Sequence, residues 1–303
     1  MSVIVQPDDG LQPVLKAING AKRTLDLIIF RFDLKPVEKA IEAAVKRGVA
    51  VRALIAHTNS GGEKRLREVE QLMLQAGVTV SRTAGDLVRY HGKMLIRDRT
   101  ELHVYGFNFT ALDFKSRSFG LVCRDHRCVQ EGLNLFEADA LKQDYEPSHE
   151  GFVVSPENAR EQLATFLKRA KKQILIWDPK VSDPQMIRLL QQRARSGLDV
   201  RIIGKVGKRG SGLRVEKFAG KRLHVRAIVR DGETAFVGSQ SLRALELDGR
   251  REVGLLTKDA KTVKRLVEIF ETDWAKTVGG GKELKKEQKA ASAEQQLAAA
   301  ASR

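Results

Sequence analysis

The 303-residue chain is long enough for one large domain or two domains of about 150 residues, and 42% hydrophobic with 30% charged residues is an ordinary globular composition. Its 54 Lys and Arg against 38 Asp and Glu give a net charge of +16, which favours polyanionic partners: nucleic acid, anionic lipid headgroups or small phosphates. Two cysteines, Cys123 and Cys128, exclude a disulfide framework and match no zinc-binding pattern.

The chain begins without the basic region and apolar run of a secretory signal. None of its stretches reaches the ~18 consecutive apolar residues of a transmembrane helix. We therefore expect a cytoplasmic protein without a transmembrane segment, for which peripheral contact with the inner membrane face stays open.

In chain order, the first half predicts alternating helices and strands. An amphipathic helix precedes an apolar strand at 25–30, and a second helix carries apolar residues with helical spacing from Val37 to Val45. Gly48 ends that helix before a strand at 51–56. A third helix at 63–75 and a strand at 78–81 follow.

The same order of elements returns in the second half. Ala170 and Gly197 repeat Ala21 and Gly48, 149 positions later, and 174–177 repeats the first apolar strand. Farther along, the offset falls to 133, which indicates that about one helix is missing from the second copy. Helices alternating with strands predict an α/β class with mixed sheets that are at least partly parallel.

The link between the two copies lies near 145–155, where Pro147 and Pro156 flank a polar stretch. We therefore expect a first half at 1–148 and a second half at 149–278. From 279 the sequence begins with three glycines and continues in Ala, Lys, Glu and Gln without a sustained apolar face. This composition predicts a flexible basic tail at 279–303.

A polar motif occurs once in each half. The first copy consists of His91, Lys93, Asp98 and Asn108. The second copy, 133 positions later, consists of His224, Arg226, Asp231 and Ser241. Two copies with the same spacing inside a duplicated chain are far stronger evidence than a single His-x-Lys.

This pattern suits chemistry at a phosphodiester. If the motif lies on a strand, the His and the basic residue two positions later point to the same face. Lys93, Arg226 and the Asn108 amide can then stabilise charge on the phosphoryl oxygens. One imidazole can attack phosphorus while the other protonates the leaving oxygen, because both titrate near neutral pH. The scheme needs no metal and no cofactor.

The repeated motif resembles the signature of the phospholipase D superfamily, His-x-Lys-x4-Asp followed by a Gly-Ser-x-Asn-type segment. The resemblance covers the chain up to the tail and implies two tandem halves related by a pseudo-twofold axis, a monomer with an internal pseudo-dimer. It implies a phosphohistidine intermediate, with His91 as nucleophile and His224 as general acid. It also casts Glu252 as an acid that braces a histidine, while the matching first-half position holds Ser118.

The sequence departs from that signature at three places. Arg226 replaces Lys, Ser241 replaces Asn, and Tyr105-Gly106 stands where Gly-Ser is usual. Asp98 and Asp231 can orient imidazoles or simply form turns. These features leave three functions open: phospholipid headgroup chemistry, which two fused halves favour; a metal-independent nuclease; and a catalytically weakened module that binds phosphate or polyanions.

Overall fold

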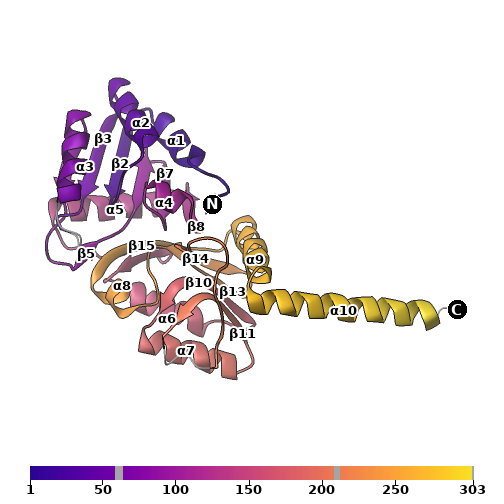
Figure 1. Cartoon of the computed structure of the whole chain (residues 1–303). Coiled ribbons are helices and arrows are strands. Elements are labelled where there is room, and N and C mark those ends of the chain that lie inside the picture. Colours follow the sequence, from indigo (N-terminus) through magenta and orange to yellow (C-terminus); the bar gives the residue numbers. More distant parts are fainter. Residues whose placement is uncertain (59–63, 208–211, 302–303) are drawn as a thin grey trace.

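The computed structural model describes residues 1–58, 64–207 and 212–301. It contains two α/β halves, which lie one above the other in Figure 1, with a long C-terminal helix projecting to one side. Each half has a mixed β-sheet flanked by helices.

The described residues of the first half form a seven-stranded sheet and five helices. The strands of its sheet are β1 (Ser2–Gln6), β2 (Thr24–Ile29), β3 (Ala50–Ile55), β4 (Thr79–Arg82), β6 (Met94–Arg97), β7 (Glu101–Tyr105) and β8 (Ser118–Cys123). The helices are α1 (Gln12–Asn19), α2 (Lys35–Lys46), α3 (Lys64–Gln75), α4 (Ala111–Phe114) and α5 (His126–Leu141). The strand order is β1-β8-β7-β6-β2-β3-β4, with β2, β3 and β4 parallel to one another.

The second half repeats this plan. Its strands are β9 (Phe152–Ser155), β10 (Gln173–Val181), β11 (Asp199–Val206), β12 (Arg214–Glu216), β13 (Arg226–Arg230), β14 (Thr234–Gly238) and β15 (Arg250–Thr257). Its helices are α6 (Ala159–Lys168), α7 (Pro184–Arg195), α8 (Ala244–Asp248), α9 (Ala260–Ala275) and α10 (Val278–Ala301). The strand order is β12-β11-β10-β13-β14-β15-β5, where β5 (Arg89–Tyr90) comes from the first half and β9 also pairs with β15.

The expected fold class, two tandem halves with mixed sheets and flanking helices, is confirmed. Gly48 and Gly197 follow the equivalent helices α2 and α7, with φ of +82° and +89°, a conformation that glycine adopts without steric cost. Helix α3 has no counterpart in the second half, since none of the described residues between β11 and β12 is helical. The helix expected at 63–75 is α3, and residue 63 itself lies outside the described residues.

The described residues form three hydrophobic cores that join the sheets to their helices. One packs α1, α2 and α3 on the first sheet, and another packs α6 and α7 on the second. The third is shared: residues of both sheets join α5 and α9, with Phe119 of the first half edge-on to Trp177 of the second at 5.0 Å between ring centroids. The two halves therefore bury apolar surface against each other as a single unit.

The halves also exchange short backbone segments. β5 leaves the first half and runs parallel to β15, and an isolated bridge between Arg117 and Leu223 makes the equivalent exchange in the other direction. The backbone N–H of His91 donates to the Arg251 carbonyl at 2.7 Å, and that of His224 donates to the Arg117 carbonyl at 2.9 Å. The backbone of His91 thus bonds to β15 of the second half, and that of His224 bonds to the residue directly before β8 of the first half.

Two buried ion pairs also connect the two halves next to these exchanged segments. Arg251 of β15 lies 3.0 Å from Asp139 of α5, and Arg117, directly before β8, lies 3.1 Å from Asp273 of α9. Each pair joins the two halves, and the two pairs occupy equivalent positions. The indole N–H of Trp177 also donates to Asp273 at 3.1 Å.

We expect Asp273→Ala to lower the free energy of unfolding by about 3–5 kcal/mol, because it leaves the buried Arg117 guanidinium without its buried partner. Urea denaturation followed by circular dichroism measures the change. The matched control is Asp248→Ala, whose 47% exposed side chain pairs with Arg160 and should cost less than about 1 kcal/mol. Equal losses in the two variants would contradict the clamping role of Asp273.

The segment expected to be a flexible tail is helical. α10 begins at Val278, and Glu283 in its second turn accepts hydrogen bonds from the Trp274 indole at 3.0 Å and from Arg214 at 2.8 Å. Alanine, lysine and glutamate are strong helix formers, which explains why the helix continues beyond these contacts and away from the body in Figure 1. Among the described residues, no helix is long and apolar enough to cross a bilayer.

Candidate active site

The two histidines of the repeated motif precede strands and do not lie within them. The strand position expected for His91 and Lys93 is wrong, because β6 begins only at Met94. In the second half, His224 also precedes its strand, and only Arg226 lies on it, as the first residue of β13. The backbone of each histidine instead docks on the other half. Both histidines are buried, with side chains that are 10% exposed at His91 and 9% exposed at His224.

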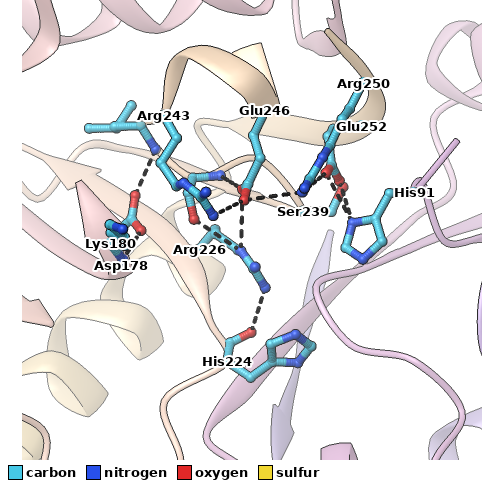
Figure 2. A network of polar contacts seen from close by, with 12 residues as sticks. His91, Asp178, Lys180, His224, Arg226, Ser239, Arg243, Glu246, Arg250 and Glu252 are labelled. Carbon is cyan, nitrogen blue, oxygen red and sulfur yellow. Dashed lines mark hydrogen bonds and ion pairs between the residues drawn. The ribbon is translucent and has the colours of Figure 1, made fainter. Parts of the chain in front are cut away.

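His91 is held by an acid from the second half. Its Nδ1 lies 2.9 and 3.0 Å from the two carboxylate oxygens of Glu252 in β15, as Figure 2 shows. Because a carboxylate only accepts hydrogen bonds, this contact places the ring proton on Nδ1 and leaves the Nε2 lone pair available. Lys93 Nζ lies 3.0 Å from that Nε2, so one phosphate group can reach both.

His224 lies against an acid from the first half. Its Nδ1 lies 3.2 Å from Oδ1 of Asp113 in α4, within ion-pair distance but outside hydrogen-bond geometry. The other carboxylate oxygen of Asp113 accepts from the Asn108 backbone and amide N–H groups at 2.8 and 2.6 Å. Arg222 donates to Asp113 at 2.5 Å. Asn108 therefore helps to orient the acid that holds His224, and its buried Oδ1 atom has no hydrogen-bond partner in the structure.

The second half builds the corresponding arrangement with arginine. Arg226 Nε donates to the Ser241 hydroxyl at 3.3 Å. Arg226 Nη1 donates to the His224 carbonyl at 3.3 Å, and Figure 2 draws this contact. Glu246 accepts from the Ser241 backbone N–H at 2.7 Å and lies 3.9 Å from Arg226. The Arg–Ser pair thus replaces the Lys and Asn of the first copy and keeps a cation beside the second histidine.

An aromatic ring and further cations surround His91. Phe30 contacts the His91 ring edge-on, at 4.6 Å between centroids. Lys93 and Arg31 each place their charge 5.7 Å from the Phe30 centroid. Phe30, Arg31, Lys93 and Asn108 border a narrow depression whose other lining residues, Ile28, Phe107 and Phe109, are apolar.

Burial largely decides the protonation states of the site residues. Burial and the nearby charges of Lys93 and Arg226 hold the pKa of His91 well below its usual range. Burial also lowers the pKa of His224 to about 4, although the contact with Asp113 opposes this, and lowers that of Lys93 to about 7. Both imidazoles are therefore neutral at pH 7 in the unliganded site. Arg226 depresses the pKa of each histidine, which shows that the two copies share one electrostatic environment.

Asp98 and Asp231 do not orient the histidines. Both have positive φ, 51° and 57°, in the turns that follow β6 and β13, at the strand ends away from the motif histidines. The Asp98 carboxylate accepts from the backbone N–H groups of the segment before β2, including Arg23 at 2.7 Å. Asp231 does the same before β10, with Lys172 at 2.7 Å. Although burial opposes it, these N–H groups lower the pKa of both carboxyls, so their role is structural.

The family model described as "Cardiolipin synthase, PLD-like domain" matches residues 14–140, which span most of the first half and include His91, Lys93 and Asn108. Residues 14–140 of this chain are therefore similar to a phospholipase D-like domain. A search of the curated proteins finds no significant match.

Solved structures share the fold of this chain. Polyphosphate kinase from Porphyromonas gingivalis aligns with a TM-score of 0.74 at 16% identity, over 89% of this chain and 49% of that protein, so the chain spans about half of its length. Phosphatidylserine synthase from Haemophilus influenzae Rd KW20 aligns with a TM-score of 0.69 at 12% identity, over 96% of this chain and 93% of that one. Nuc, a phospholipase D family member from Salmonella typhimurium, covers 48% of this chain at 22% identity, with a TM-score of 0.41.

Sequence reasoning about this phospholipase D-like chain missed Asp113. The signal was present, since Asp113 follows Asn108 by five positions and Glu246 follows Ser241 by five. The repeat thus carries an acid in both halves beyond the motif positions considered. Ser118, the counterpart of Glu252, donates its hydroxyl to the His224 carbonyl at 3.1 Å and does not brace an imidazole.

Proposed function

We propose that this protein cleaves or transfers phosphodiesters through a covalent phosphohistidine on His91, with His224 as general acid and then general base. The observation that carries the proposal is the crossed bracing of the two imidazoles, His91 by Glu252 and His224 by Asp113. Each half supplies a histidine to the site and an acid to the other histidine, so the site is complete only when both halves are present.

In the first step, His91 Nε2 attacks phosphorus, a P–N bond forms and the bond to the leaving oxygen breaks. His224 gives its Nε2 proton to that oxygen. In the second step, His224 takes a proton from water or an alcohol, whose oxygen attacks phosphorus and releases His91. Lys93 and Arg226 stabilise the charge on the phosphoryl oxygens in both steps.

Binding of an anionic substrate also favours the protonated form of His224, the general acid. His224 is neutral in the unliganded site at pH 7, and a bound phosphodiester adds a negative charge that raises its pKa. Proton uptake by His224 therefore accompanies substrate binding. Asp113 stabilises the imidazolium that forms, because it holds the opposite ring nitrogen.

We favour phospholipid headgroups as the substrate. Support comes from the family model, whose description names cardiolipin synthase, and from the shape shared with phosphatidylserine synthase over nearly the whole chain. Nuclease activity is the second candidate, because the net charge of +16 also suits a nucleic-acid backbone.

The deciding experiment offers the purified protein bis(p-nitrophenyl) phosphate, phosphatidylcholine/phosphatidylglycerol vesicles, and single- and double-stranded DNA. We expect turnover of the aryl diester, resistant to EDTA, and release of headgroup from vesicles. DNA cleavage without headgroup release would assign the protein as a nuclease. Salt-sensitive binding of these anions with no product from any of them would overturn the catalytic proposal in favour of a binding module.

A further inference from the structure

Two leucines are exposed at equivalent positions of the two halves. Leu112 of α4 is 60% exposed and Leu245 of α8 is 39% exposed. Each is the second residue of its short helix and directly precedes a buried acid of the site, Asp113 or Glu246. A single exposed leucine is ordinary, but its recurrence beside both site acids indicates a feature of the site opening.

A third exposed apolar side chain lies near Leu245. Val88 is 63% exposed and directly precedes β5, which leads to His91. A β-carbon added to Gly249 would lie 3.2 Å from Leu245 Cδ1 and 3.8 Å from Val88 Cγ2, so the two side chains converge over this glycine. We call Val88, Leu112 and Leu245 the apolar rim.

Arginines accompany the apolar rim. Arg222, 43% exposed, binds Asp113 beside Leu112, and Arg243, 32% exposed, binds Glu246 beside Leu245. Arg31 is exposed next to Phe30, the ring that contacts His91. Exposed aliphatic groups among cations match a bilayer interface, where the apolar groups enter the boundary between headgroups and acyl chains and the cations meet anionic lipid.

We propose that the apolar rim and its arginines dock the active site onto an anionic lipid bilayer, so that Leu112 and Leu245 enter the bilayer surface beside the two site acids. This inference rests on the proposed function, since it explains how a buried site reaches the phosphate of a lipid that stays in its membrane. A nucleic-acid strand would gain little from aliphatic side chains, because bases bind by stacking on aromatic rings.

The test compares Leu112→Ser, Leu245→Ser and the double variant with Leu74→Ser, a control on α3 whose leucine is 54% exposed. Sedimentation with vesicles of phosphatidylcholine with or without phosphatidylglycerol measures binding. Hydrolysis of soluble bis(p-nitrophenyl) phosphate measures the chemistry. We expect the double variant to lose at least about tenfold in partition to phosphatidylglycerol vesicles and to keep its turnover of the soluble diester, while the control keeps both.

Three results would overturn the proposal. The double variant could bind vesicles as well as the wild type does, or Leu74→Ser could lose as much vesicle binding as the double variant. The third is equal binding of the wild type to vesicles with and without phosphatidylglycerol. Failure of the proposed function has a different signature. If the wild-type protein leaves the soluble diester intact, the chemistry is refuted, and the sedimentation series still decides whether the apolar rim binds lipid.

Discussion

His91→Ala should abolish turnover of every phosphodiester, including an aryl diester whose leaving group needs no protonation. The Nε2 lone pair of His91 is held toward the substrate by the contact of Nδ1 with Glu252, and no covalent intermediate can form without it. We expect a loss of at least about 10⁴-fold in kcat. Stopped-flow release of p-nitrophenol and acid-labile phosphate on the denatured protein measure the two consequences.

His224→Ala should behave differently, because a general acid matters most for a poor leaving group. We expect about a 10²- to 10⁴-fold loss with an alkyl leaving group and a much smaller loss in the first burst with p-nitrophenolate, which leaves without a proton. The phosphohistidine should then accumulate, since the base for the second step is missing.

The control for both histidine variants is His57→Ala, which removes an exposed histidine and should leave turnover unchanged. Equal sensitivity of the two site variants to the leaving group would refute the division of roles between His91 and His224. Full activity in either variant would refute the mechanism.

Glu252→Gln and Asp113→Asn should each lower kcat by about 10²- to 10⁴-fold with the fold intact. Each substitution keeps the shape of the side chain but removes the carboxylate that fixes the histidine tautomer and stabilises the imidazolium. Asp98→Asn is the matched control, because asparagine tolerates positive φ and still accepts backbone hydrogen bonds, so kcat should stay within about threefold.

Asp113→Asn also has a direct readout in the titration of His224. Burial lowers the pKa of His224 to about 4, and the carboxylate of Asp113 opposes that effect. Removing the negative charge should therefore move the midpoint below 4, as followed by NMR of ¹⁵N-labelled imidazoles. An unchanged or higher midpoint would contradict the assignment of Asp113 to His224.

Repetition within the sequence determined the class of fold. The matched alanines and glycines of the two copies, Ala21 with Ala170 and Gly48 with Gly197, predicted equivalent helices and strands in both halves. These signals are local, because apolar periodicity and helix-ending glycines depend on a few neighbouring residues. The same repetition selected both histidines and their basic neighbours.

Only the tertiary structure decided which acids serve which histidines. Asp98 and Asp231 carried the spacing of the motif, yet their carboxylates cap backbone segments at the other ends of the strands. Asp113 is 111 positions from His224 and Glu252 is 161 positions from His91, and the fold brings each pair together by exchanging segments between the halves. Such long-range pairing follows from how two sheets pack, which no local pattern encodes.

The sequence thus determined which two histidines form the site, and the packing determined their environment. Burial of His91 and His224, the depression of their pKa values and the exposure of Leu112 and Leu245 all arise where the two halves meet. The physical reason is that solvation and electrostatics depend on every group packed around a side chain, whereas residue identity and spacing belong to the chain alone.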